Sequence, residues 1–440
     1  MRLTTGHWLF LFGFISCLFW VNKNLSWSSA SRSALPLTIV LEGNLEVSEY
    51  QEFSGDWATL DQQVYCDKPP LQGILMVPII EAISIFTDLD SMSPESQLQL
   101  VAILGTILFS CLPFALLMFF CYRWQLKETR HGLLLVVFAF MGSYLFVLSA
   151  DFWNHLFSAL LIVLSYRSLE KRQFYMFGLY LGAAVCNEYS LVLIGFAFGL
   201  WLLLQKEWKG IMHGVLGLLP FALFLAFYNW QLTGNALDLP YRYQENFIQN
   251  SEDYGFTAPS LEAIWHTLIS PYRGLLFYAP LLLGLAFLKP WKKQISFTLM
   301  EKFVLITSLC FYFIMISNKS WVGGWVYGPR YLAVIPALLF FVFLRHIRIE
   351  NTVSRLVFYG LGVLGLVVSF FGKFFPISAP TGVKFPLMNE GWPALLEGRF
   401  NNNHLVGYLG IEGAAGAVCF LILFGAGLFF LNKRHSKSLV

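Results

Sequence analysis

The sequence predicts an all-α polytopic membrane protein with about twelve transmembrane helices and with interfacial helices in its first outer loop. Hydrophobic residues make up 57% of the 440 positions and charged residues only 12%, and the mean hydropathy is +0.62. Soluble chains are about one quarter charged. Apolar runs of roughly the length needed to cross ~30 Å of hydrocarbon recur along the chain. Aromatic residues, 18% of the total, gather at the ends of these runs, as interfacial belts do.

The apolar runs define the expected helices. They lie near 7–21, 71–87, 98–122, 131–149, 152–166, 174–204, 213–232, 273–288, 301–317, 331–344, 356–371 and 411–431. The run 174–204 is interrupted by Cys186-Asn187-Glu188, so we expect two short helices there. We expect the first run to be an uncleaved helix rather than a signal peptide, because it leads directly into a loop with functional features.

The distribution of basic residues orients these helices. Six basic clusters lie at 123–130, 167–172, 206–209, 289–293, 345–355 and 433–437. The positive-inside rule places all six in the cytoplasm. This requires that segment 71–87, which contains Pro78 and Glu81, lies on the outer face without crossing. Both termini are then inside, and the long outer loops are 22–97, 233–272 and 372–410.

Composition also excludes some classes of protein. The formal charge of +3 is too small to indicate a nucleic-acid partner. Of the seven cysteines, all but Cys66 fall in apolar runs, and no C-x-x-C motif occurs. We therefore expect neither a disulfide framework nor a structural zinc site.

The first outer loop carries a dense set of acidic residues. Periodicity from Ser48 to Leu60 predicts a short amphipathic helix, on which Glu49, Glu52 and Asp56 share one face. Such carboxylates are candidates for acid–base chemistry beside Tyr50, a candidate substrate contact. The alternative is a solvated acidic face without a catalytic role.

Two further positions suit a site at the outer surface. Asp151 lies just after the run 131–149, where that helix is expected to meet the outer surface, and Asn154 and His155 follow it. A carboxylate at that depth in the membrane is costly unless it is paired or functional. The alternative is a helix N-cap. Lys68 precedes two prolines and lies at headgroup level, where an ammonium suits a lipid phosphate or simply anchors the chain.

Arginines in later loops are candidate phosphate ligands. Arg330 ends the turn Gly328-Pro329-Arg330, and Arg273 follows Ser270-Pro271-Tyr272. A guanidinium can donate two parallel hydrogen bonds to phosphate oxygens. An interfacial arginine in a tight turn is the simpler interpretation. In the loop 233–272, Tyr241 and Arg242 are candidate substrate contacts, but aromatic rings serve interfacial packing equally well.

Taken together, these motifs resemble the GT-C glycosyltransferases, membrane enzymes that use polyprenyl-phosphate sugars. The similarity is to the protein O-mannosyltransferase-like group and to lipid A aminoarabinose transferase. It rests on one helix, an acidic outer loop, the Lys68-Pro69-Pro70 segment and an acid at position 151. The family's first acidic motif, usually Asp-Glu, aligns with Ser48-Glu49, so its aspartate is absent here. Asp151 aligns with the second acid, and Lys68-Pro69 with the family's Lys-Pro pair.

The resemblance implies a reaction and a division of roles. Glu49 or Asp56 would act as general base on an acceptor hydroxyl, while Lys68, with Arg330 or Arg273, would neutralise the departing phosphate. Asp151 would orient the acceptor or help to hold a divalent metal. The metal stays open, because some members of the family use one and others do not.

The resemblance also implies modules, partners and a location. Residues 1–232 would form the catalytic transmembrane module and 233–440 a C-terminal module. The partners would be a polyprenyl-phosphate sugar, an unidentified hydroxyl acceptor and membrane lipid, at the extracytoplasmic face of a bacterial inner membrane. Two other classes stay open: a lipid or solute transporter, for which Glu188 beside the helix break is the strongest feature, and a non-catalytic membrane subunit.

Overall fold

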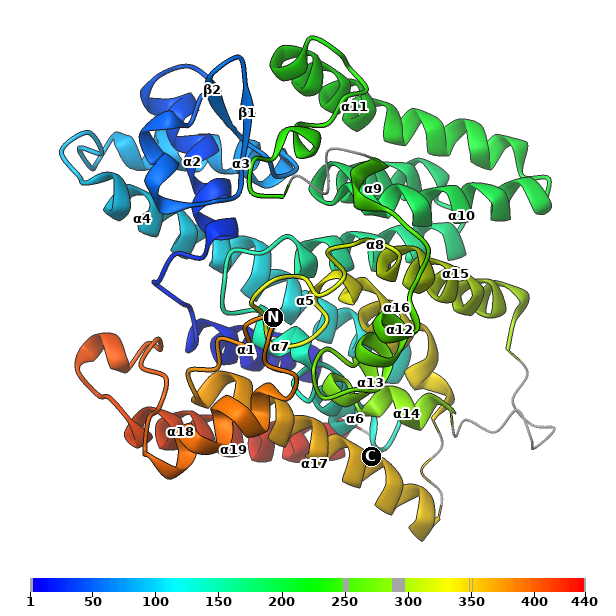
Figure 1. Cartoon of the computed structure of the whole chain (residues 1–440). Coiled ribbons are helices and arrows are strands. Elements are labelled where there is room, and N and C mark those ends of the chain that lie inside the picture. Colours follow the sequence, from blue (N-terminus) through cyan, green and yellow to red (C-terminus); the bar gives the residue numbers. More distant parts are fainter. Residues whose placement is uncertain (1–2, 248–252, 287–296, 348, 350, 439–440) are drawn as a thin grey trace. The chain divides into compact units, whose positions relative to one another are not determined.

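The computed structural model describes residues 3–247, 253–286, 297–347, 349 and 351–438. These residues are overwhelmingly helical and include one two-stranded sheet (Figure 1). They divide into two units, each assembled from separate stretches of the chain. Unit 1 comprises 1–21, 111–150 and 259–440, and unit 2 comprises 22–110 and 151–258. The units therefore alternate along the sequence, whereas the expected modules 1–232 and 233–440 are contiguous; that functional division stays a prediction.

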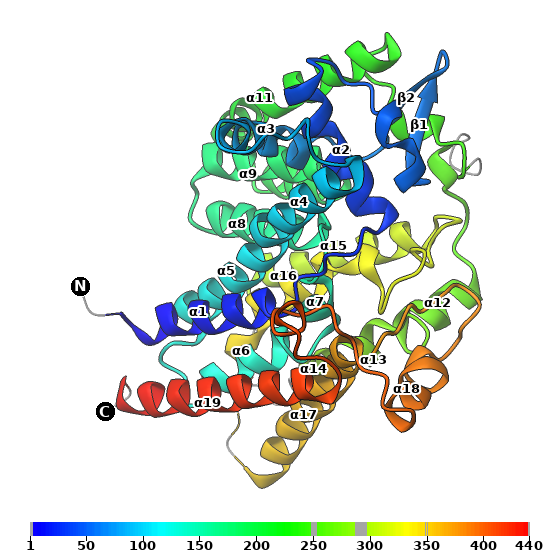
Figure 2. The ribbon, with the colours of Figure 1, turned by 90° about the vertical axis from the view of Figure 1, so that its left-hand side faces the viewer.

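Unit 1 is built from apolar helices. Its elements are α1 (Thr5–Leu18), α5 (Leu112–Cys121), the π-helix η3 (Tyr122–Leu126), α6 (Gly132–Phe140), α7 (Tyr144–Leu148), α12 (Leu261–Leu268), α13 (Leu275–Tyr278), α14 (Leu281–Ala286), α15 (Leu299–Ile316), η8 (Arg330–Leu332), α16 (Val334–Phe343), η9 (Leu344–His346), α17 (Thr352–Phe374), η10 (Leu387–Gly391), α18 (Trp392–Leu396), η11 (Gly407–Leu409) and α19 (Ala414–Ser438). The first and last helices, α1 and α19, pack against each other and lie side by side in Figure 2.

Unit 2 contains the first outer loop and the helices from α8 to α11. Its elements are α2 (Trp27–Leu41), η1 (Ser48–Phe53), β1 (Trp57–Leu60), β2 (Gln63–Cys66), α3 (Leu71–Ser84), α4 (Pro94–Thr106), α8 (His155–Glu170), α9 (Phe174–Asn187), η4 (Tyr189–Leu191), α10 (Val192–Leu204), α11 (Trp208–Thr233), η5 (Pro240–Tyr243) and η7 (Asp253–Gly255). A π-turn, η2 (Ile107–Cys111), continues α4 into α5, so that Pro94–Leu126 is one helical segment.

The helices confirm a multi-pass membrane protein. Among the described residues, five are long and apolar enough to span a bilayer: Pro94–Leu126, Trp208–Thr233, Leu299–Ile316, Thr352–Phe374 and Ala414–Lys437. Four shorter apolar helices accompany them, α1, α3, α9 and the pair η4–α10. The count of twelve spans stays a prediction, and the basic cluster 289–293 lies outside the described residues. The helix break at Glu188 is confirmed, because its backbone is extended between α9 and η4.

Close backbone contact holds α9 against α11. A Cβ atom at Gly178 would collide with the carbonyl group of Gly214, and one at Gly217 would collide with that of Tyr175. Small residues allow two helices to approach closely enough for their backbones to pack, which is the usual way that helices associate in a bilayer. The glycines of α9 and α11 therefore allow these two helices of unit 2 to pack in direct backbone contact.

One expectation about the first outer loop is wrong. The segment 48–60 is not one helix: the 3₁₀-turn η1 ends at Phe53, and Trp57–Leu60 forms strand β1. The break follows from Ser54-Gly55, where a glycine interrupts the helical pattern. The loop also contains a 15-residue helix, α2, that the runs of apolar residues do not reveal, because its buried side is made largely of serine and alanine.

Candidate functional site

A β-hairpin assembles the charged centre of unit 2. Strand β1 pairs antiparallel with β2, with Trp57 opposite Cys66 and Leu60 opposite Gln63. The two-residue turn at Asp61-Gln62 has positive φ at both positions, 49° and 69°, as the turn type that suits hairpin twist requires. Since Trp57 faces Cys66, the residues just outside this pair, Asp56 and Asp67, meet at the open end of the hairpin.

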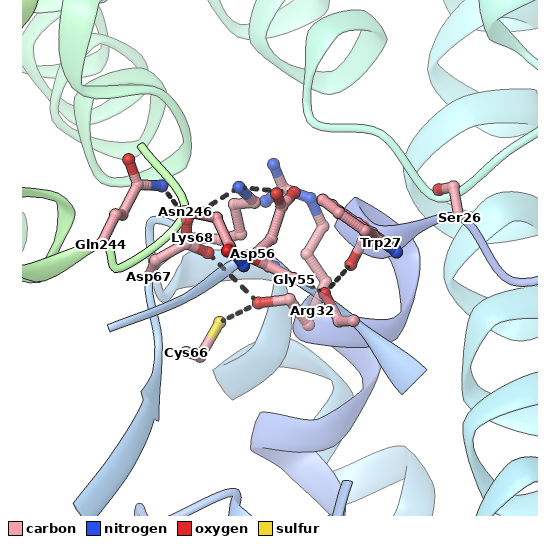
Figure 3. A network of polar contacts seen from close by, with 12 residues as sticks. Ser26, Trp27, Arg32, Gly55, Asp56, Cys66, Asp67, Lys68, Gln244 and Asn246 are labelled. Carbon is pink, nitrogen blue, oxygen red and sulfur yellow. Dashed lines mark hydrogen bonds and ion pairs between the residues drawn. The ribbon is translucent and has the colours of Figure 1, made fainter. Parts of the chain in front are cut away.

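Lys68 lies between these two carboxylates. Its Nζ atom is 2.9 Å from Asp56 Oδ2 and 2.9 Å from Asp67 Oδ2 (Figure 3). The side chains of Lys68 and Asp56 are 12% and 10% exposed, and that of Asp67 is fully buried. Burial favours loss of the ammonium proton, but the two carboxylates outweigh it and raise the pKa of Lys68. Lys68 therefore keeps its positive charge and is held in position by the two carboxylates.

The loop after α11 closes over this centre. Ala58 of β1 forms a backbone bridge with Gln244, whose side-chain amide donates to Asp67 Oδ2. Asn246 Nδ2 donates to the Gly55 carbonyl at 2.9 Å. Burial, opposed by Lys68, raises the pKa of the Asp67 carboxyl. Two segments that are far apart in sequence, the loop 22–97 and the residues just after α11, therefore build one cluster.

Arg32 of α2 supplies a second buried cation, 5% exposed. Its Nη2 atom donates to Asn154 Oδ1 at 3.0 Å, whereas Nε and Nη1 are buried and have no hydrogen-bond partner among the described residues. Burial lowers the pKa of the guanidinium, partly offset by Cys66, Asp67, Glu188 and Asp56, yet an arginine stays charged in proteins. Unsatisfied donors on a buried cation are costly, and an anionic ligand would satisfy them.

Asp151 borders the same helix. Its carboxylate receives the backbone N–H of Phe152 at 2.8 Å and contacts the side chains of Ser26 and Ser29. Burial nevertheless raises the pKa of the carboxyl, and the side chain stays half-buried, within reach of a ligand. Ser26, Ser29 and Arg32 follow one another at three-residue spacing on one face of α2. Asp151 therefore lies against the serine end of this row, and Arg32 stands at the other end.

The other predicted residues of unit 2 make contacts of their own. Glu49 lies on η1 with most of its side chain exposed. Partial loss of contact with water, together with the nearby Glu42, raises the pKa of its carboxyl. Tyr50 is fully buried and donates to Gln97 Oε1 at 2.6 Å, as a packing residue does. His155 begins α8, with Nδ1 3.5 Å from Glu188 Oε2. Tyr241 and Arg242 lie on η5, where Arg242 Nη1 is 3.6 Å from Asp238 Oδ1.

The two predicted phosphate-binding arginines belong to unit 1. Arg273 is fully buried and donates to four carbonyl oxygens, those of Tyr272, Val322, Gly324 and Ala379, at 2.8–3.1 Å. Its donors thus hold loop backbone together. Arg330 donates to Tyr331 Oη at 3.3 Å and lies over that ring. The role of either arginine toward phosphate stays a prediction.

Sequence reasoning missed two members of the cluster, Arg32 and Gln244, and it named Asp67 and Asn154 without giving either a role in the site. A detectable signal was the single arginine within the small-residue segment 26–34, at helical spacing from Ser26 and Ser29. The place of Asp67 in the cluster depends on the register of the hairpin, and that of Gln244 depends on a contact between two loops. Patterns of residue type along the chain reveal neither. Within the described residues, no group of three or more His, Cys, Asp or Glu side chains is arranged to hold a metal ion.

The fold and the cluster define a helical, multi-pass membrane protein with a buried cation–carboxylate site at its β1–β2 hairpin. No protein-family model and no curated protein sequence matches the chain. Its fold is similar to that of ArnT from Cupriavidus metallidurans bound to undecaprenyl phosphate, with a TM-score of 0.50 and 12% sequence identity, over 97% of this chain and 76% of that chain. The apo ArnT structure gives a TM-score of 0.48 and 13% identity, over 97% and 75%. The predicted resemblance is thereby confirmed for the fold alone.

Proposed function

We propose that this protein is a membrane glycosyltransferase that moves a sugar from a polyprenyl-phosphate donor to a hydroxyl group of a lipid, glycan or protein acceptor at the extracytoplasmic face. One observation carries the proposal. Arg32 keeps two buried N–H donors without partners, in a cluster whose other cation is Lys68. The phosphodiester anion of such a donor supplies the oxygens that those N–H groups lack, and the phosphate monoester released as product does so too. The fold shared with ArnT, solved with undecaprenyl phosphate, supports the same donor class.

The residues of the cluster have distinct roles in this reaction. Arg32 and Lys68 would bind the phosphate and stabilise the negative charge that develops on it as the sugar departs. Asp56 and Asp67 would position the Lys68 ammonium rather than take part in proton transfer, because both are already bound to it. Gln244 would keep the Asp67 carboxylate in place.

Asp151 is the best candidate for the general base. Its carboxylate is half-buried and has no lysine or arginine partner among the described residues, and burial raises its pKa toward the range that favours proton transfer. The acceptor oxygen would attack the anomeric carbon while its proton passes to Asp151. The bond between that carbon and the phosphate oxygen breaks, its electron pair leaves with polyprenyl phosphate, and the single displacement inverts the anomeric centre.

The experiment measures release of free polyprenyl phosphate by the full chain in nanodiscs, with a panel of polyprenyl-phosphate sugars and membrane extract as acceptor. We expect Asp151→Asn to reduce release by at least about a hundredfold, the scale of losing a general base. We expect Arg32→Gln to reduce it roughly ten- to a hundredfold, the scale of losing a charged hydrogen bond. Glu49→Gln, an exposed carboxylate outside the cluster, should retain release.

The outcomes separate the candidate functions. If only Glu49→Gln lost release, Glu49 and not Asp151 would be the general base. Absence of release from every donor, in protein that still binds polyprenyl phosphate, would favour a transporter or a non-catalytic subunit. Absence of both binding and release would refute the proposal.

A further inference from the structure

Unit 1 contains a crevice of about 1330 Å³ where α1 begins and α19 ends. Its charged lining consists of five basic residues and a single acidic one: Arg123, Lys127, Lys433, Arg434, Lys437 and Glu128. We name it the basic crevice. Its residues belong to the N-terminus of α1, the π-helix η3 and the residues after it, and the last turns of α19, so none is shared with the Arg32–Lys68 cluster of unit 2.

Most of this positive charge is uncompensated. Glu128 is used by Lys127, with 3.3 Å between Oε1 and Nζ. Across residues 3–247, 253–286, 297–347, 349 and 351–438, no carboxylate forms an ion pair with Arg123, Lys433 or Arg434. Charges of one sign gathered in a concave site concentrate the field and attract an anion of the opposite sign.

The walls of the crevice are held in place before any ligand binds. The Arg434 guanidinium lies 5.1 Å from the ring centroid of Trp8 on α1 and 4.9 Å from that of Phe430 on α19. These two rings meet edge to face at 5.1 Å. The buried His435 joins α19 to the other wall, with Nδ1 2.8 Å from Tyr122 Oη and Nε2 3.1 Å from the Thr129 carbonyl. A preorganised cation loses little conformational entropy on binding.

Apolar groups lie beside the cations. Leu3 and Phe430 line the crevice, and Trp124 of η3 stacks on Phe120 at 4.3 Å. A small soluble anion would use only the charged groups, whereas a lipid would also cover the apolar ones. The positive-inside rule assigns this end of the helices to the cytoplasm, where the leaflet is rich in anionic phospholipid. Basic pockets between helices on that side suit such headgroups.

We propose that the basic crevice binds the phosphate headgroup of an anionic phospholipid of the cytoplasmic leaflet. Arg434, fixed against Trp8 and Phe430, and Arg123 contact the phosphate, and Lys433 and Lys437 complete the cationic rim. A soluble phosphate ester has the same charged group but no acyl chain, so the test includes both.

The test uses the full chain in detergent. Binding of short-chain phosphatidylglycerol, phosphatidylcholine and glycerol phosphate is measured by native mass spectrometry and by the shift in unfolding temperature. We expect phosphatidylglycerol to bind best, and Arg123→Gln/Arg434→Gln to weaken it about tenfold or more, since each basic group near a lipid surface contributes roughly a kilocalorie. The matched control, Lys206→Gln/Lys209→Gln, removes two charges from a basic cluster that does not line the crevice and should change nothing.

A second variant guards against a folding defect. Lys433→Gln/Lys437→Gln keeps Arg434 on its aromatic partners and removes only exposed lysines, so it should also weaken phosphatidylglycerol binding. Equal binding of phosphatidylcholine, or equal weakening in the control, would overturn the proposal. Displacement of the lipid by glycerol phosphate at matched concentration would show that the ligand is a soluble phosphate ester and would overturn the lipid assignment.

Discussion

Arg32 Nη2 donates to Asn154 Oδ1 at 3.0 Å, across 122 residues of sequence. Asn154 is the N-cap residue of α8, so this hydrogen bond ties α2 of the first outer loop to the start of that helix. Asn154 and Asn187 also exchange hydrogen bonds between side-chain amide and backbone carbonyl, at 3.3 and 3.0 Å. The bond to Asn154 engages Nη2 of the guanidinium and leaves Nε and Nη1 for a ligand.

Replacing Arg32 should therefore affect phosphate binding more than folding. In Arg32→Gln the amide can still donate to Asn154, but the charge is lost. Hydrogen bonds to charged groups contribute about 1.5–3 kcal/mol, so we expect polyprenyl phosphate to bind roughly ten- to a hundredfold more weakly. Titration with a fluorescent polyprenyl phosphate measures this. Arg32→Lys should recover part of the affinity, and unchanged binding in Arg32→Gln would remove this residue from the phosphate site.

Replacing Lys68 should destabilise the protein. Lys68→Met leaves the Asp56 and Asp67 carboxylates facing each other without their cation, and breaking a buried pair in this way costs about 3–5 kcal/mol. Unfolding in detergent, followed by tryptophan fluorescence, checks the value. Lys384→Met is the control: its pair with Glu262 spans 3.5 Å between side chains more than half exposed, and its loss should cost under about 1 kcal/mol. Similar losses in both variants would contradict a buried charge centre.

The raised pKa of Asp151 predicts a pH dependence of stability. Burial lets the folded protein keep this proton above about pH 3.9, where the unfolded chain has lost it. The folded state then binds more protons, so stability falls as pH rises from that value through the folded pKa. Asp151→Asn should remove this component of the decline. Melting temperatures of both proteins between about pH 4 and pH 8 test it, and parallel curves would show that Asp151 titrates normally.

The contact between α9 and α11 should tolerate no side chain at Gly178. A Cβ there meets the Gly214 carbonyl, so Gly178→Ala must move a helix backbone and should cost about 1–3 kcal/mol. Gly199→Ala in α10 is the matched control, because nothing lies within 4 Å of its added Cβ. That control should be neutral or slightly stabilising, since alanine favours a helix. Equal melting temperatures in the two variants would argue against the close approach.

The hairpin turn offers a stabilising substitution. Gln62 has φ of 69° in a two-residue turn, a conformation that costs a residue with a side chain roughly 1–2 kcal/mol and glycine almost nothing. Gln62→Gly should therefore raise the melting temperature by a few degrees. Gln63→Gly, one position on and inside β2, should lower it because glycine weakens a strand. A destabilising effect of Gln62→Gly would indicate a different turn.

Apolar runs were a good guide to the spanning helices and a poor one to the outer loop. Runs such as 213–232 and 356–371 correspond to α11 and α17, because a lipid-facing helix must be apolar over its whole length. Helix α2 has no such requirement. Its buried residues are small and polar as well as apolar, so it resembles a loop in composition.

The sequence likewise predicted only the part of the candidate site that residue type and position can indicate. Lys68, Asp56 and Asp151 were identified from residue type and position relative to the membrane. Glu49 was selected with Asp56 because one helix was expected to carry both, and the strand that begins at Trp57 separates them. Arg32 and Gln244 were missed because a hydrogen bond across more than a hundred residues leaves no periodic trace in the sequence.

Arg273 also constrains how this protein can be engineered. Its guanidinium joins its own loop to carbonyl groups at Val322, Gly324 and Ala379, so three segments of unit 1 depend on a single side chain. A chimera that receives only one of these segments from a related enzyme would leave carbonyls or N–H donors unmatched. The loops around 273, 318–330 and 372–381 therefore form one exchangeable cassette, and they should be transplanted together.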